Sequence, residues 1–310
     1  MQWQPGASLG AIRERARVYR QIRNFFNARG LLEVDTPLLM PTTSTDVHID
    51  SFEVVSAGRR HFLQTSPEYA MKRLLATGSG SIFQICHAFR QDERGRLHNS
   101  EFSLLEWYHV GYDYRQLMDE IELLITTLSL RQCEFSRIRY KDLFREALDL
   151  DIDALDIDAL RRECARRIDG CDSAALDFEQ CLDLLLSFAI APGMRGYQFV
   201  YDYPVEQAAL ARVSRDDASV AERFELFYDG VELANGFSEL TDAPEQRARF
   251  EADNRKREAS GLPIRDLDEQ LLAALDEGLE DCAGVAVGLD RLLMVLLDLD
   301  SIGDVIAFRD

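Results

Sequence analysis

The sequence predicts an α+β fold, in which an antiparallel sheet is flanked by helices, and two hairpins and one helix carry that prediction. Residues 83–90 and 98–108 each alternate apolar and polar side chains and enclose a charged loop, which is the pattern of two paired strands. A second hairpin is centred on Asp229-Gly230, a dipeptide typical of tight β turns. Residues 9–29 instead carry apolar side chains at helical spacing between arginines.

Length and composition indicate one globular domain over residues 1–310. The chain is 46% hydrophobic, which is enough for a full core, and no linker or internal repeat divides it. Its six cysteines form no C-x-x-C pair, which argues against a zinc site or a disulfide framework. We find no leader-like N-terminus and no apolar run long enough to span a bilayer, so we expect a cytoplasmic protein without membrane contact.

The formal net charge of −20 restricts the classes of partner. Phosphate contacts dominate nucleic-acid affinity, so proteins with a large nucleic-acid interface usually carry a basic excess. This chain has the opposite balance. A large tRNA interface is therefore disfavoured, and the arginines of residues 13–20 are most simply interpreted as a solvated helix face.

Turn residues and periodicity give the order of the elements. Gly30 is suited to end the first helix, and residues 31–39 follow as an extended segment that Pro37 breaks. Residues 142–196 are acidic and leucine-rich with helical periodicity, which predicts a helical insertion within the domain. Strand patterning resumes at residue 197 and again from residue 224.

A second helix is predicted close to the first hairpin. Ser66 is expected to be its N-cap, Pro67 its first helical residue, and Gly78 its end. Glu68 then lies in the first turn and faces whatever binds at that end of the helix.

The first hairpin combines residues that suit a phosphate, an aromatic ring and a cation. Alternation places Arg90 at the end of one strand and Phe102, Glu106 and Tyr108 on one face of the other. A guanidinium binds a carboxylate and a phosphate in a bidentate manner, a phenyl ring can stack on a purine, and Glu106 with Tyr108 can hold an ammonium. Taken singly, each residue is more often a structural ion pair or a core aromatic. Their combination favours a site.

The second hairpin brings two acidic residues together. Counting outward from its turn pairs Phe227 with Glu232, and this places Glu225 diagonally on the same face. Two such carboxylates repel unless a cation lies between them, and Mg²⁺ bridging nucleotide phosphates is the natural occupant. The alternative is a surface hairpin with unpaired acids.

Further along the same strand, strict alternation puts Asn235 and Glu239 on the opposite face. If these two residues line the same pocket as Glu232, Gly236 must mark a bulge or bend.

A third stretch, residues 282–294, reads as a strand of small residues followed by a helix. Gly288 lets a ligand approach the backbone closely, and Arg291 emerges in the first turn of the helix.

Residues 9–39, 83–108 and 282–294 resemble, in this order, motifs 1, 2 and 3 of class II aminoacyl-tRNA synthetases, and specifically their lysyl branch. The resemblance implies the class II catalytic fold, a homodimer built through motif 1, and activation of a lysine-type amino acid by ATP and Mg²⁺ as an aminoacyl-adenylate.

Carried over position by position, the resemblance also implies site residues. The nucleotide would contact Arg90, Gln91, Asp92, Asn99, Phe102, Glu232, Leu233, Gly288 and Arg291. The amino acid would contact Ser66, Glu68, Glu106, Tyr108, Asn235, Phe237, Glu239 and Ala286. Arg90 and Arg291 would be the catalytic arginines, and Glu225 with Glu232 would hold Mg²⁺.

One departure from the lysyl branch concerns the acceptor. Lysyl-tRNA synthetases carry an anticodon-binding barrel before motif 1, whereas here motif 1 begins almost at the N-terminus. With the acidic charge, this resembles stand-alone paralogues that join (R)-β-lysine to a lysine of elongation factor P. We therefore expect elongation factor P as acceptor, no anticodon recognition and no tRNA. Ala286, where lysyl-tRNA synthetases carry glycine, could shift selectivity from α-lysine to an isomer with a shifted amine.

Three alternatives stay open from the sequence. They are a truncated lysyl-tRNA synthetase that charges tRNA, an adenylate-forming amide synthetase, and a non-catalytic regulatory paralogue. The last is the least favoured, because Arg90, Arg291, Glu225 and Glu232 are all present.

Overall fold

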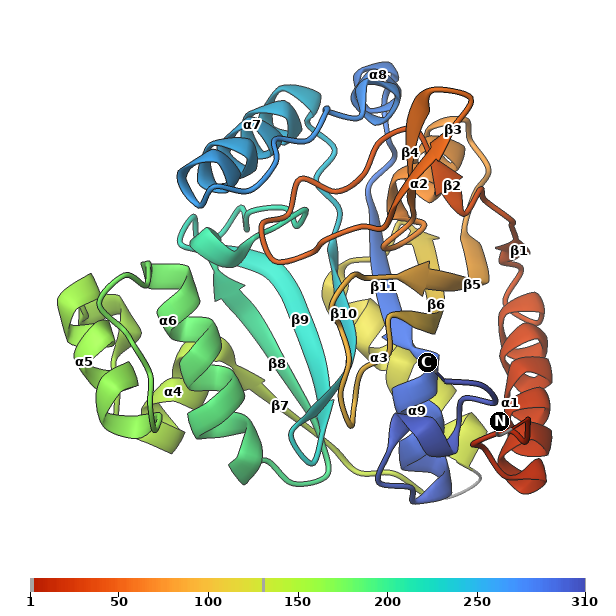
Figure 1. Ribbon diagram of the computed structural model, residues 1–310, viewed down its shortest axis with the longest axis horizontal. Helices are drawn as coiled ribbons and strands as arrows, with labels where there is room; N and C mark the ends of the chain where they lie inside the picture. The colour runs from red at the N-terminus through yellow and green to blue at the C-terminus, as the bar shows by residue number, and fades with distance from the viewer. Residues whose placement is uncertain (1–2, 130–131, 310) are drawn as a thin grey trace.

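A mixed eight-stranded sheet lies at the centre of the protein, in a computed structural model that describes residues 3–129 and 132–309 (Figure 1). The spatial order of its strands is β1-β5-β6-β11-β10-β9-β8-β7. All neighbours from β5 to β8 pair antiparallel, whereas the outer strands β1 and β7 run parallel to theirs. The strands are β1 (Leu32–Glu33), β5 (Ile82–Phe89), β6 (Glu101–Val110), β7 (Phe135–Arg139), β8 (Tyr197–Pro204), β9 (Val220–Tyr228), β10 (Val231–Ser238) and β11 (Cys282–Gly288).

Helices cover both faces of this sheet, which confirms the predicted α+β class. The helices are α1 (Leu9–Asn27), α2 (Glu68–Ala76), α3 (Tyr114–Ser129), α4 (Tyr140–Leu148), α5 (Ile157–Arg167), α6 (Phe178–Leu184), α7 (Ala243–Ala259), α8 (Glu269–Glu277) and α9 (Leu289–Leu297). The main core joins α1, α3 and α9 to one face of the sheet, where Phe26 packs on Phe83 and Trp107. This face is sealed, so the opposite face is the one that can receive a ligand.

Helix α1 forms where the sequence predicts it. The Ser8 hydroxyl caps its N-terminus by accepting a hydrogen bond from Ala11 N at 3.1 Å. Its buried side chains, Val18, Ile22 and Phe26 among them, recur at helical spacing, as the periodicity predicts.

The start of α2 differs from the prediction by one residue. Pro67 is the N-cap, and the helix begins at Glu68. Ser66 lies before the cap, where its hydroxyl accepts from Glu68 N at 3.1 Å and donates to Glu106 at 2.8 Å. Ser66 thus serves both the helix end and a buried carboxylate of the sheet, a partner that the local sequence does not reveal.

Between β7 and β8 the chain forms α4, α5 and α6 with their own core, beside β7 and β8 in Figure 1. Helix α4 begins at Tyr140, two residues before the boundary expected from composition. This helical layer packs onto the sheet through Val200, Tyr203 and Phe227.

The hairpin of β9 and β10 contains a bulge at an unexpected position. The turn at Asp229-Gly230 and the pairing of Phe227 with Glu232 are as predicted. The register then shifts between Glu232 and Ala234, so the bulge falls at Leu233 and not at Gly236.

Gly236 has a different function in the strand. A Cβ there would lie 2.6 Å from Phe224 Cζ and 2.8 Å from Val285 Cβ, so the residue is required by close packing. The strand pattern alone cannot distinguish a glycine that bends a strand from one that is crowded by its neighbours.

A small sheet and two helices stand over the open face of the main sheet. The small sheet is formed by β2 (Leu39–Met40), β4 (Arg59–Leu63) and β3 (Glu53–Ser56), and α7 and α8 lie beside it (Figure 1). No helix within residues 3–129 and 132–309 is long and apolar enough to cross a membrane.

Candidate active site

The open face of the sheet carries the predicted site residues in register. Cross-strand pairing aligns one row through five strands, namely Gln84, Glu106, Ala286, Asn235 and Glu225. The neighbouring row consists of Ile82, Tyr108, Gly284, Phe237 and Arg223. Side chains opposite each other in a sheet share a face, so residues distant in sequence form one floor.

The bulge at Leu233 decides the composition of this floor. Without it, Glu232 and Asn235 would point to opposite faces of the sheet. Glu232 pairs with Phe227, and Asn235 pairs with Glu225. Since Glu225 and Phe227 are two residues apart on β9, Glu232 and Asn235 lie on the face of the sheet that carries Glu225. The bulge therefore joins the predicted metal carboxylates to the predicted amino-acid pocket.

A cavity of about 740 Å³ covers this floor, and α2, α7, the first turn of α9 and residues 40–49 contribute to its walls. Every predicted site residue lines it except Gln91 and Asp92. Asp92 has a left-handed backbone, and Gln91 N donates to Asp50 O at 2.7 Å, so the chain turns outward here. Glu93 lines the cavity in their place and pairs with Arg90 at 3.5 Å.

At one end of the cavity Arg90 lies over the ring of Phe102, 5.1 Å from its centroid. Its Nε is buried and has no hydrogen-bond partner in the described part of the chain. A buried unpartnered donor is costly, so this atom is suited to an anionic ligand such as a phosphate or a carboxylate.

Arg291 is held at the same end by the hairpin loop. It donates to Glu232 O at 2.8 Å and to His98 Nε2 at 2.7 Å. Burial and the nearby Arg291 lower the pKa of His98, which keeps the imidazole neutral and able to accept. The sequence analysis did not single out His98, although it lies within residues 98–108 of the first hairpin.

An ion pair and a hydrogen bond connect residues of all three motifs at the wall of the cavity. Asp290 of α9 pairs with Arg15 of α1 and accepts a hydrogen bond from Ser103 N of β6 at 2.7 Å. Asp290 directly precedes Arg291, so this contact fixes the helix turn from which the arginine emerges.

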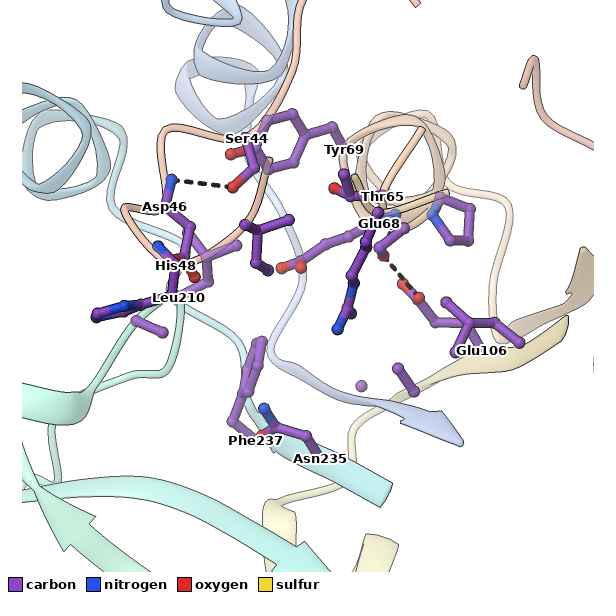
Figure 2. Close-up of a pocket in the computed structure, with 18 of the residues that line it drawn as sticks. Ser44, Asp46, His48, Thr65, Glu68, Tyr69, Glu106, Leu210, Asn235 and Phe237 are labelled. Carbon is purple, nitrogen blue, oxygen red and sulfur yellow. Dashed lines mark hydrogen bonds between the residues drawn. The ribbon is translucent and has the colours of Figure 1, made fainter. Parts of the chain in front are cut away.

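At the other end of the cavity lie three carboxylates from three elements: Glu68 of α2, Glu106 of β6, and Glu239, which directly follows β10. Figure 2 shows Glu68 and Glu106 near each other, with Asn235 and Phe237 on the strand beneath. Both oxygens of Glu106 accept hydrogen bonds, from Tyr108 at 2.7 Å and from Ser66 at 2.8 Å.

Burial makes these carboxyl groups weaker acids than usual. It raises the pKa of Glu106 to about 7 and that of Glu239 to about 8. Gly284 makes room for this end, since a Cβ there would lie 2.4 Å from both Glu239 Oε1 and Tyr108 Cε1. An acidic pocket of this kind can receive an ammonium group.

Lys72 is a buried charged residue at this end that the sequence analysis did not single out. Its ammonium lies 2.6 Å from Glu68 and 2.6 Å from Glu239, and its side chain is 1% exposed. A signal was available: Lys72 follows Glu68 by four residues on a helix, the spacing of an ion pair. Its contact with Glu239 depends on tertiary structure and has no local signature.

The predicted metal carboxylates lie on the floor near the arginines. Glu225 pairs with Arg223 at 2.6 Å, and burial, with Glu232 nearby, raises the pKa of Glu225 to about 7. The described residues contain no cluster of three or more His, Cys, Asp or Glu that could hold a metal alone. Two carboxylates fit Mg²⁺, which takes its remaining ligands from phosphates and water.

Comparison with known proteins decides the family. A family model described as tRNA synthetases class II (D, K and N) matches residues 6–310. The chain belongs to the class II tRNA synthetase family. This membership and the observed sheet confirm the fold that the three motifs imply.

Within the class II tRNA synthetase family, the chain is similar to named ligases. It is 48% identical to the elongation factor P–(R)-β-lysine ligase of Edwardsiella ictaluri (strain 93-146), over 99% of this chain and 97% of the relative. It is 47% identical to the enzyme of the same name from Klebsiella pneumoniae (strain 342), with the same coverage.

Proposed function

We propose that the chain is an ATP-dependent ligase that activates a lysine-type amino acid, (R)-β-lysine, and transfers it to a lysine of elongation factor P. The observation that carries this proposal is the polarity of the cavity, with two arginines at one end and three carboxylates at the other. The relatives named as elongation factor P–(R)-β-lysine ligases support the choice of amino acid and acceptor.

The first step needs no general base from the protein. The carboxylate of the amino acid is already ionised, and one of its oxygens attacks the α-phosphorus of ATP in line. The new bond joins carboxyl oxygen to phosphorus, the bond to the β-phosphate oxygen breaks, and pyrophosphate leaves. Arg90 aligns the two anions and offsets their charge, and Arg291 contributes positive charge on the side of the leaving group.

Magnesium belongs to this proposal as a cation that phosphate oxygens would coordinate. Glu225 and Glu232 would hold the ion, whose chemistry is to neutralise phosphate charge. Arg223 holds Glu225 in place by the 2.6 Å ion pair.

In the second step the amine of the acceptor lysine attacks the acyl carbonyl of the adenylate. An amide bond forms, the bond from carbonyl carbon to phosphate oxygen breaks, and AMP leaves with its electron pair while a proton is lost from the amine. The cavity extends past the site to Asp46 and His48, which gives an acceptor side chain a route inward (Figure 2).

The assembly proposed here is one domain with the helical layer as an insertion, acting in the cytoplasm as a homodimer. Exposed leucines on and beside α1 and β1 support the dimer, since Leu9, Leu32 and Leu39 are 66%, 55% and 43% exposed. If these leucines form the dimer interface, Leu32→Glu should be a monomer in light scattering.

Two measurements test the proposed reaction. We expect ATP–pyrophosphate exchange that depends on (R)-β-lysine, and a mass gain of elongation factor P after incubation with enzyme, ATP and this amino acid. Exchange without any mass gain would reject the acceptor and favour an amide synthetase. Aminoacylation of tRNA in place of the protein would establish the truncated tRNA synthetase instead.

A further inference from the structure

Lys72 stands behind the acidic end of the cavity and does not line it. Its ammonium bridges Glu68 and Glu239, at 2.6 Å from each, and lies 5.5 Å from the centroid of the Phe237 ring. The position is therefore that of a fixed counter-ion in the wall, while the cavity in front of it is left for a ligand.

The three carboxylates at this end need such a counter-ion. Burying like charges together is costly unless each is paired or protonated. Although burial lowers the pKa of Lys72, the carboxylates of Glu239 and Glu68 raise it above its usual value, so the ammonium stays charged. When a ligand has displaced the protons from all three carboxyl groups, one fixed positive charge against three carboxylates leaves two negative charges for the ligand to balance.

Glu239 supplies buried acceptors at this end that no hydrogen bond satisfies, because neither of its oxygens has a hydrogen-bond partner among the described residues, although Oε2 lies 2.6 Å from the Lys72 ammonium. Both oxygens of Glu106 already accept hydrogen bonds, and Lys72 contacts Glu239 Oε2. Glu239 Oε1 is buried and has no hydrogen-bond partner within residues 3–129 and 132–309. A ligand ammonium placed there would satisfy an atom that otherwise carries a desolvation penalty.

We propose that Lys72 is a positioning residue that sets this pocket at two negative charges and so selects amino acids with two ammonium groups over those with one. The inference rests on the proposed amino-acid activation. A diamino acid brings two ammonium groups, which the two remaining charges balance, and its own carboxylate faces Arg90. An amino acid with one ammonium leaves one buried carboxylate unpaired or protonated.

The test compares Lys72→Met with Lys72→Arg and with Lys141→Met, the same change at a lysine of α4 outside the cavity. Binding by calorimetry and pyrophosphate exchange are measured for (R)-β-lysine, lysine and norleucine from pH 6 to 9. Without Lys72 the carboxyl groups hold their protons more tightly. For Glu239, whose pKa is about 8, a rise of one pKa unit lowers the deprotonated fraction about tenfold at pH 7.

For Lys72→Met we expect the KM for lysine-type amino acids to rise about tenfold at pH 7, with the KM for ATP little changed. The defect should shrink as the pH rises, and the preference for lysine over norleucine should narrow. Lys72→Arg, which keeps the charge, should retain the pH profile and the preference with a higher KM. Lys141→Met should match the parent.

The outcomes separate the two proposals. If the parent shows no exchange with any lysine isomer, the proposed function is wrong. If the parent is active and a folded Lys72→Met has an unchanged amino-acid KM, pH profile and preference, the inference about Lys72 is wrong. If Lys72→Met does not fold, Lys72→Arg decides, and loss of the lysine preference with the charge retained would contradict the inference.

Discussion

At the scale of single residues, Glu106 and Glu239 make amino-acid binding depend on pH. The ligand-free pocket holds protons on these groups up to about pH 7 and 8, and an ammonium ligand must displace them. Affinity for a lysine-type amino acid should therefore rise as the pH rises from 6 to 8.5, with protons released on binding. Calorimetry in buffers of different ionisation enthalpy measures both. The affinity of Glu106→Gln for the amino acid should change less with pH than that of the parent. An affinity of the parent that does not change with pH would contradict the assigned protonation of Glu106 and Glu239.

Ala286 permits a second prediction at this scale. It lies in the floor between Glu106 and Asn235, so its methyl group projects into the amino-acid pocket. Ala286→Gly should move the kcat/KM ratio toward α-lysine relative to (R)-β-lysine, by about tenfold for a single methyl group in contact. The matched control is Ala283→Gly on the core face of the same strand. An unchanged ratio in Ala286→Gly would reject the selectivity role.

All but two of the site residues that the motifs predict line the cavity, because the chemistry of each residue is visible in its type. Gln91 and Asp92 are the exceptions, since a left-handed backbone at Asp92 directs the loop outward. Lys72 and Arg223 were missed for a different reason. Each contacts partners that only the tertiary structure brings close. Lys72 forms an ion pair with Glu239, and Arg223 donates a hydrogen bond to Gln207 O.

At the scale of elements, Gly236 shows why strand β10 cannot accept a side chain at that position. Gly236→Ala should destabilise the fold by about 1–3 kcal/mol through overpacking against Phe224 and Val285. Chemical denaturation measures the loss. Gly193→Ala is the matched control, because a Cβ there meets nothing within 4 Å. A neutral Gly236→Ala would show that the neighbours yield more easily than their distances indicate.

Elements were predictable where the pattern is local. Alternation and the Asp-Gly turn indicate both hairpins, and periodicity indicates α1. The bulge at Leu233 was not predictable. Alternation along a strand predicts which side chains share a face, but it does not show where the register with the partner strand shifts. The outer parallel pairs also escaped prediction, since β1 and β5 are far apart in the chain.

At the scale of the whole molecule, the buried carboxyl groups link folding to pH. Their ordinary pKa is 4.5, and in the fold it is raised for Glu106, Glu225 and Glu239. Between pH 4.5 and 8 the native state therefore holds protons that the unfolded chain has released. The contribution of these groups to the free energy of unfolding is therefore greatest below pH 4.5 and is lost as the pH rises toward 8.

Thermal unfolding from pH 5 to 8.5 tests this linkage. The unfolding temperature of the ligand-free protein should fall toward pH 8. A saturating lysine-type amino acid should raise the unfolding temperature more at pH 8 than at pH 5.5, because it binds the deprotonated pocket. Glu106→Gln/Glu239→Gln should flatten the ligand-free curve. A ligand effect that is equal at both pH values would be inconsistent with this account.

The basic side chains of this protein are almost all arginines, and this affects how the protein can react with its own product. Of its 35 basic residues only Lys72, Lys141 and Lys256 are lysines. Each lies near a carboxylate, with Lys141 3.7 Å from Asp153 and Lys256 2.7 Å from Glu179. An acyl-adenylate is an electrophile that reacts with neutral amines, and guanidinium groups are far poorer nucleophiles. The protein thus offers its own product few places to react, and its mass should stay constant during turnover without an acceptor.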